Sequence, residues 1–308
     1  MRKILMLMMI AIILLSACSE ENDAEEGKVP DEVTAETENE EKEDDVDEIE
    51  EKTEETEEAS ESSNPSGAQE IFQKAAEVMS GLESVNLTGE IISRTDMMGI
   101  VENTTSQING KVSMQPFAQH LNMNTESDIE GVTESEMFIT EEIMYMTDPE
   151  SGGWLSMSME HGGMMGDVSA MISEAQLHYF EENHDLFKLT EVSDHYVMMY
   201  EGAGEDFKRV VFGAMKDLVG DEAYESMTGM IQEISGKYVF TIDKDTFDIV
   251  AMQMDIEQTM DFGVGQMDST EQISYEYSGF NEVEPVIVPE NVVENALSIG
   301  LPGGMGAD

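Results

Sequence analysis

Apolar residues first recur at helical spacing over residues 66–82. Ser66 followed by Gln69 has the spacing of a helix capping box, and Gly81 lies near the expected end of the helix. The apolar positions are Ile71, Phe72, Ala75, Val78, Met79 and Leu82. This spacing predicts a long amphipathic helix that opens the folded part of the chain.

The pattern then changes to a period of two. Apolar residues alternate with polar ones in four segments, which contain Leu87/Ile91, Ile108/Val112/Met114, Leu121/Met123 and Met144/Met146. Glycine-rich or asparagine-rich breaks such as "MMGIVENTT" and "IEG" separate the segments. Alternation with short turns predicts an antiparallel meander with one buried face.

The middle of the chain returns to helical spacing. Residues 168–179 and 207–218 fit one helix face each, and Tyr224, Met227, Ile231 and Ile234 predict a further helix. Between the first two, Tyr196, Met198 and Tyr200 alternate like a strand. The last third alternates again over residues 238–242, 250–256 and 273–277, with "DKDTFD" as a hairpin turn.

This order of elements contains no βαβ repeat and predicts an α+β fold, a curved antiparallel sheet with helices on its concave face. Residues 66–300 are long enough to bury a core as one domain, and residues 301–308 are expected to be a flexible tail.

The first seventeen residues have the three parts of a secretory signal peptide. Arg2 and Lys3 precede an apolar run, and the small residues Ser16 and Ala17 precede Cys18. The tetrad Leu15–Cys18 resembles the lipobox of bacterial lipoproteins, which implies that residues 1–17 are removed and that Cys18 carries the lipid. Cys18 is the single cysteine and has no intrachain disulfide partner. An ordinary cleaved signal with a chance cysteine is the alternative.

An acidic low-complexity segment follows, and residues 18–65 are predicted to be a disordered tether. It is interpreted as a solvated spacer, with binding of cations or of a basic wall component as the alternative. The whole chain has 14 Lys and Arg against 68 Asp and Glu, and a formal net charge of -54. Such a charge repels nucleic acid, which excludes that class of partner.

Three motifs resemble a group of Gram-positive lipoproteins of unassigned function related to the LolA/LppX-type half-barrels. They are "MYMTDPESGGWLSM", "YVFTIDKDTFDIVAMQMDI" and "YSGFNEVEPVIVPENV". The resemblance implies an unclosed half-barrel with helices that plug an apolar cavity. In characterised relatives this cavity carries lipids or lipoprotein acyl chains.

Catalytic motifs are absent from the sequence. It has no G-x-S-x-G, no glycine-rich phosphate loop and no H-E-x-x-H. The residues "DKDTFD" lack the glycine of an EF-hand loop. We therefore expect no enzymatic activity and no cofactor.

Methionine is the remaining anomaly, with 27 among 308 residues. Three interpretations stay open: core filling, an adaptable apolar pocket, or a Cu(I) site. The predicted cavity residues are Met144, Met146, Trp154, Met157, Met252, Met254 and Tyr275, and the predicted lid residues are Phe207, Val211, Met215 and Leu218. The weaker metal alternative uses Met157, Met159, His161, Met164 and Met165.

The sequence as a whole predicts a non-catalytic lipoprotein on the outer face of the cell membrane. It is expected to be a monomer that binds a hydrophobic or amphipathic ligand, such as lipid, between sheet and helices. Cation or Cu(I) handling is one alternative. A module that binds envelope proteins and has no small ligand is the other.

Overall fold

The computed structural model describes residues 60–61, 65–149, 151–158, 174–213, 224–225, 228–263 and 265–299. Its helices are α2 (Pro65–Ser80), α3 (Glu174–Glu182), the short 3-10 helix η1 (His184–Leu186), α4 (Gly204–Phe212) and α7 (Glu290–Asn295). Its first strands are β1 (Ser60–Glu61), β2 (Ser84–Met97), β3 (Ile100–Met114), β4 (Phe117–Ser127), β5 (Gly131–Thr140), β6 (Ile143–Thr147) and β7 (Trp154–Ser158). The later strands are β8 (Lys188–Val192), β9 (His195–Ala203), β10 (Ile231–Asp243), β11 (Ile249–Asp261), β12 (Gln266–Ser278) and β13 (Leu297–Ser298).

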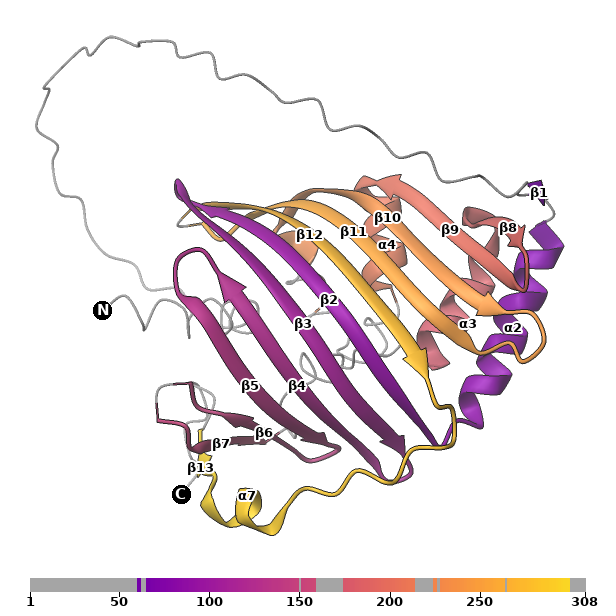
Figure 1. The fold of residues 1–308 in the computed structure, drawn as a ribbon. Coiled ribbons are helices and arrows are strands. Elements are labelled where there is room, and N and C mark those ends of the chain that lie inside the picture. The colour runs from indigo at the N-terminus through magenta and orange to yellow at the C-terminus, as the bar shows by residue number, and fades with distance from the viewer. Residues whose placement is uncertain are drawn as a thin grey trace, which may run out of the picture.

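Within these described residues, thirteen strands form one sheet in the order β1-β8-β9-β10-β11-β12-β2-β3-β4-β5-β6-β7-β13. Neighbouring strands are antiparallel except for β7 and β13. The two end strands, β1 and β13, do not pair with each other in the described part, so the sheet is unclosed. Figure 1 shows the sheet curving around α2, α3 and α4. The predicted α+β half-barrel with helices on its concave face is confirmed.

The predicted hairpin at "DKDTFD" joins β10 to β11. The Asp243 carboxylate accepts hydrogen bonds from the backbone N–H groups of Asp245 and Thr246, each at 2.9 Å. These bonds lower the pKa of Asp243. Phe247 has a φ of 62°, a left-handed conformation that closes the turn.

The main core is centred on Phe72 of α2, which is fully buried. Its ring lies 4.9 Å from Phe187, 5.8 Å from Phe180 of α3 and 6.0 Å from Phe240 of β10, measured between centroids. Two of these contacts are edge-on, the geometry that the aromatic quadrupole favours. One ring therefore joins α2, α3, the segment before β8 and the sheet.

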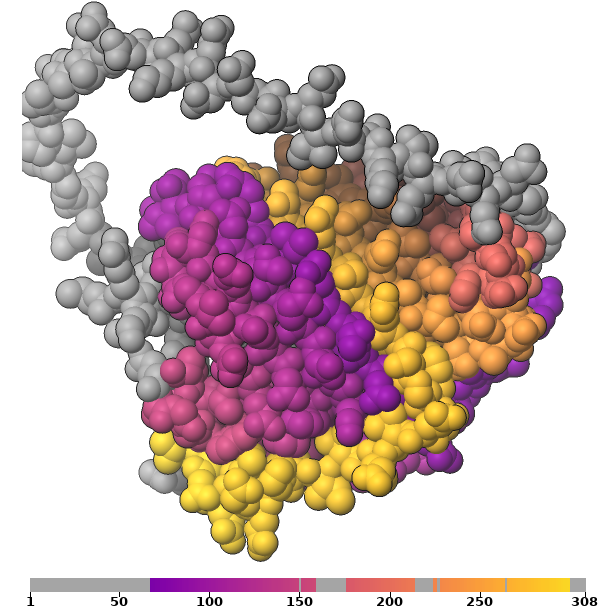
Figure 2. Space-filling model, viewed as in Figure 1, coloured from indigo at the N-terminus to yellow at the C-terminus, as the bar shows by residue number. Residues whose placement is uncertain are grey.

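The chain after β12 forms a C-terminal strap, residues 279–299, that passes the ends of the neighbouring strands on its way to β7 (Figures 1 and 2). The Asn281 side chain accepts a hydrogen bond from the Glu83 backbone N–H at 2.6 Å, and Ser113 Oγ accepts one from the Val286 backbone N–H at 2.9 Å. Val292 of α7 then packs with Phe138 and Tyr145 in a second, smaller core. The strap thus fixes β5–β7 against the rest of the sheet.

The helix predicted over residues 224–234 is wrong at its end, because Ile231 and Ile234 belong to β10. Both are buried, and a β-bulge between Ile231 and Glu233 brings them to the same face at a separation of three. A bulge can therefore imitate helical spacing. For the other two predicted helices, residues 174–182 and 204–212 are helical as expected, and residues 168–173 and 214–218 lie outside the described residues.

We predict that Phe72→Ala destabilises the protein by about 3–5 kcal/mol, because it leaves a cavity between three other aromatic rings. Urea unfolding followed by circular dichroism measures this. Val132→Ala is the control, since Val132 is 67% exposed and its truncation should change the free energy of unfolding by less than about 0.5 kcal/mol. Equal effects of the two substitutions would contradict the central position of Phe72.

Candidate functional site

The register of the strands assigns every side chain to one of two faces. We call the face that carries α2, α3 and α4 the inner face, and the opposite one the outer face. Tyr238 and Phe240 of β10 pack under the helices, and they pair with Met254 and Met252 of β11. Because directly paired residues share a face, each further pairing extends the assignment from β11 across to β7.

The inner face carries a set of methionines that we call the methionine wall. It consists of Met123, Met137, Met144, Met146, Met157, Met252 and Met254. Five of these seven were predicted from the sequence. Met123 and Met137 were not predicted. Each is two residues from an apolar residue on the same face, Leu121 and Ile139 respectively, so following the alternation to the end of each strand would have found them.

The members of the wall differ in burial. Met144, Met157 and Met252 are buried in the main core, whereas Met123, Met137, Met146 and Met254 are only partly buried. Tyr238 donates a hydrogen bond from its hydroxyl to Met252 Sδ at 3.2 Å. Among the described elements, the helices make their main contacts with the sheet at β8, β9 and β10, so they support only one half of the inner face.

Tyr275 also lies on the inner face, where it pairs with Gly89 of β2. A Cβ atom at Gly89 would overlap the Tyr275 ring, so the glycine lets the ring lie flat across β2. Burial raises the pKa of Tyr275 to about 12. The ring continues the apolar surface between Met252 and Ile108.

Trp154 does not line this wall, which corrects the prediction from the sequence. It lies three residues before Met157 in β7, and side chains at an odd separation in a strand point to opposite faces. Trp154 packs on the outer face, 5.7 Å from Phe138 between ring centroids, with the C-terminal strap. It belongs to the smaller core.

Two of the predicted lid residues are in α4. Phe207 is fully buried and stacks on Tyr200 of β9 at a centroid distance of 5.9 Å, and Val211 is partly buried against the main core. Lys208, which follows Phe207 in α4, donates one hydrogen bond to the Ile231 carbonyl at 2.7 Å and another to the Glu205 carboxylate at 2.9 Å. This part of α4 is fixed to β9 and β10. Met215 and Leu218 lie outside the described residues, and a lid role stays a prediction.

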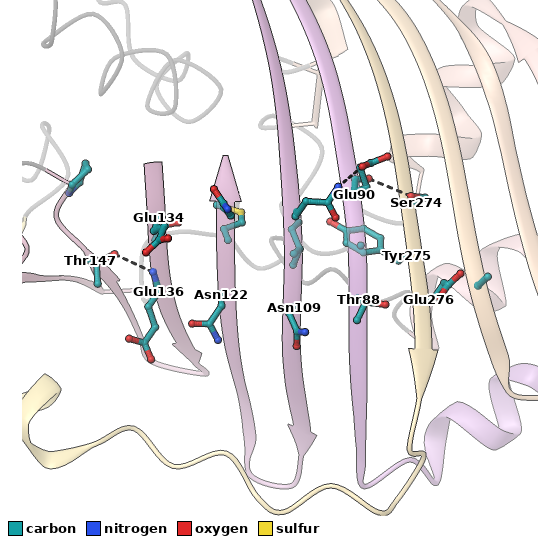
Figure 3. Close-up of a pocket in the computed structure, with 18 of the residues that line it drawn as sticks. Thr88, Glu90, Asn109, Asn122, Glu134, Glu136, Thr147, Ser274, Tyr275 and Glu276 are labelled. Atoms are coloured by element: carbon teal, nitrogen blue, oxygen red, sulfur yellow. Dashed lines mark hydrogen bonds between the residues drawn. The ribbon is translucent and has the colours of Figure 1, made fainter. Parts of the chain in front are cut away.

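The outer face is hollowed by a polar trough of about 1020 Å³. Figure 3 shows Glu276, Thr88, Asn109, Asn122 and Glu136 side by side on neighbouring strands, in one row across the sheet. A second row and the β6–β7 turn complete this outer trough. Its carboxylates are Glu90, Glu134, Glu136, Asp148 and Glu276, and its amides are Gln107, Asn109, Asn122, Asn124 and Gln253. No Lys or Arg is among the described residues that line it.

Several groups of the outer trough are held in place by hydrogen bonds. Glu136 Oε1 lies 2.8 Å from His120 Nε2, and the Glu136 backbone N–H donates to Thr147 Oγ1 at 3.0 Å. The Gln107 amide donates to the Glu90 carboxylate. The trough is therefore an ordered surface of acceptors and amides.

A family model matches residues 67–297, three quarters of the chain. The protein belongs to the family of unknown function DUF6612. No curated protein matches this DUF6612 chain.

Solved structures similar to the DUF6612 domain include three bacterial proteins. LprF from Mycobacterium bovis is 12% identical with a TM-score of 0.35, over 73% of this chain and 97% of LprF. A putative outer membrane lipoprotein-sorting protein domain from Vibrio parahaemolyticus is 10% identical with a TM-score of 0.25, over 74% and 96% of the two chains. A DUF1329 family protein from Desulfovibrio piger is 9% identical with a TM-score of 0.27, over 69% and 90%. Values this low carry no inference about ligand or activity.

Among the described residues of the DUF6612 chain, no three His, Cys, Asp or Glu side chains converge as metal ligands. Of the copper alternative, Met157 is on the methionine wall, and Met159, His161, Met164 and Met165 lie outside the described residues, as does Cys18. None of the helices described has the length and apolar character needed to cross a membrane.

Proposed function

We propose that this protein is a non-catalytic, extracytoplasmic lipoprotein that binds an apolar or amphipathic ligand, such as lipid, on its inner face. The observation that carries the proposal is the methionine wall, with four members that remain partly exposed on a concave surface. Methionine has an unbranched, polarisable side chain, so such a wall adapts to flexible chains rather than to one rigid shape.

The dimensions of the wall suit a long apolar chain. Its methionines lie on β11 at one side and on β4–β7 at the other, and Tyr275 and Ile108 continue the apolar surface on the strands between them. Neighbouring strands are about 4.8 Å apart, so the seven spacings from β11 to β7 make this surface roughly 34 Å wide. An extended acyl chain lying across the strands would contact the side chains of several of them.

The N-terminus supports the location. The apolar run before Cys18 and the small residues preceding it suit lipid attachment at that cysteine, and the acidic segment suits a spacer that holds the folded domain away from the membrane. A tethered domain of this kind would meet its ligand at the membrane surface.

The outer trough supports a second candidate, a module that binds a basic segment of another envelope protein. The described residues of the trough include five carboxylates and no Lys or Arg, so this lining attracts ammonium groups and repels acids. A lysine-rich peptide in an extended conformation could follow the row of acceptors across the strands.

The first proposal predicts that the purified chain binds Nile red, a neutral apolar dye, and that Met123→Glu with Met137→Glu weakens this binding at least about tenfold. Each new carboxylate would have to be desolvated beneath the ligand, which opposes binding. Dye fluorescence measures the dissociation constant.

Met199→Glu is the matched control, because Met199 is partly buried on the outer face of β9. It should leave the dissociation constant unchanged within about twofold, a difference of less than 0.5 kcal/mol. Absence of dye binding to the original chain, or equal loss in both variants, would refute binding on the inner face.

The second candidate predicts that a lysine-rich peptide binds the chain and that Glu134→Gln with Glu136→Gln weakens it about fivefold, since exposed charge pairs contribute about 0.5 kcal/mol each. Calorimetry at low salt measures the affinity. Glu130→Gln with Glu201→Gln removes the same charge elsewhere on the surface. If both double variants weaken the peptide equally, only the net charge attracts it and the trough is not its site.

A further inference from the structure

Along the length of its strands, the inner face has an apolar part followed by a polar band. The methionine wall occupies the half nearer the C-terminal strap. Beyond the wall, a band of inward positions on β11, β12, β2, β3 and β4 is polar, and we call it the polar belt: Ser93, Thr95, Glu102, Thr104, Ser106, Thr125, Ser127, Gln258, Ser269 and Glu271. The row at the far end of these strands, Met260, Met267, Met97 and Ile100, is apolar again. The concave surface is thus amphipathic.

Several side chains of the polar belt bond to one another. Ser106 Oγ lies 2.8 Å from Thr125 Oγ1, and Ser127 Oγ donates to the Glu102 carboxylate at 2.7 Å. The β3–β4 part of the belt therefore satisfies its own polar groups. The side chains of the belt on β12 lack such hydrogen bonds within the described part of the chain.

Glu271 of β12 is directly flanked by Ile256 on β11 and Ser93 on β2. Within the described part of the chain it has no hydrogen bond and no ion pair. Desolvation alone raises the pKa of its carboxyl group above the usual value. An ionised carboxylate at this position is unfavourable as long as nothing pairs with it.

Ser269 precedes Glu271 by two residues and lies on the same face. It is 5% exposed, and its Oγ has no hydrogen-bond partner among the described atoms. Buried hydroxyls are usually hydrogen-bonded, so this one is available for a ligand. Two unpartnered oxygen acceptors thus lie next to each other on one strand.

We propose that Glu271 and Ser269 bind the primary ammonium group of an amphiphile whose apolar chain lies on the methionine wall. This inference rests on the proposed function and adds the chemical class of the ligand. A primary ammonium offers three N–H donors and one positive charge, which matches a carboxylate and a hydroxyl side by side. Carboxylate and phosphate headgroups would be repelled.

The spacing along β12 agrees with such a ligand. Tyr275, which continues the methionine wall, is four residues after Glu271, or roughly 13 Å along the strand, and Ile273 lies between them. A headgroup at Glu271 is therefore followed directly by apolar contacts.

The test compares four twelve-carbon amphiphiles, each below its micelle concentration, as competitors of Nile red on the full chain. Dodecylammonium should bind at least about tenfold more tightly than dodecanol, since a charge-assisted hydrogen bond is added. Dodecyl sulfate should bind more weakly than dodecanol. Dodecyltrimethylammonium, which has charge but no N–H donor, should bind more weakly than dodecylammonium, and equal affinity would overturn the role of Ser269.

Glu271→Gln should reduce the preference for dodecylammonium over dodecanol to within about twofold, each affinity being measured against Nile red on the same variant. Glu257→Gln is the matched control, because Glu257 is exposed on the outer face of β11, and it should keep the full preference. A preference that survives Glu271→Gln overturns the proposal. Absence of Nile red binding would instead refute the proposed function itself.

The thermal stability of the Glu271→Gln variant distinguishes a binding role of Glu271 from a structural role. The pKa of Glu271 is higher in the folded state than in the unfolded state. The contribution of Glu271 to the free energy of unfolding is therefore most favourable below the unfolded-state pKa, and it is lost as the pH rises through the folded-state pKa. The ligand-free Glu271→Gln variant should therefore have a higher Tm than the original chain at pH 8, and the same Tm at pH 3. A lower Tm at pH 8 would show that Glu271 has a structural partner, contrary to the proposal.

Discussion

The packing of Phe72 against Phe180, Phe187 and Phe240 determines where the helices lie. It joins three segments that are far apart in the chain and places them over β8–β10. Lys208 adds a polar anchor for α4 at the bulged start of β10. One half of the curved sheet is consequently a helix–sheet core, and among the described elements the helices make their main contacts with that half.

The second constraint is the period of two in the strands. Continuous pairing from β11 to β5 gives every strand an inward and an outward series, so residues adjacent in sequence serve opposite surfaces. Met123 lies on the inner face between Asn122 and Asn124, which line the outer trough. One sheet thus separates an apolar surface from an acidic one by the thickness of a single layer. A ligand on either face contacts strands that also form the other.

Much of this arrangement follows from the sequence, and the failures have identifiable physical causes. Alternation predicts β2–β4, β6, β9 and β10–β12, and it assigns Met252 and Met254 to one face. Trp154 and Met157 were predicted to line the same cavity, although they are three residues apart and therefore point to opposite faces of β7. The error came from grouping them by their apolar character instead of by their spacing along the strand. The helix predicted to include Ile231 and Ile234 was wrong for a different reason, because a β-bulge gives these two strand residues the spacing of a helix. The pairing order of thirteen strands and the missing partners of Ser269 and Glu271 depend on contacts distant in sequence, which no local pattern contains.

The high negative charge of the chain gives Glu271 its physical context. A formal net charge of -54 creates a field that makes every additional ionised carboxylate less favourable, and it attracts cations toward the domain. Glu271 adds desolvation to this repulsion, and nothing in the described core compensates for it. Natural sequences retain such locally unfavourable groups chiefly at functional sites. A cationic headgroup would relieve both effects at once, because it would be drawn in by the field and would neutralise the one inward carboxylate of β12. The acidity of the surface and the position of Glu271 therefore favour the same class of ligand.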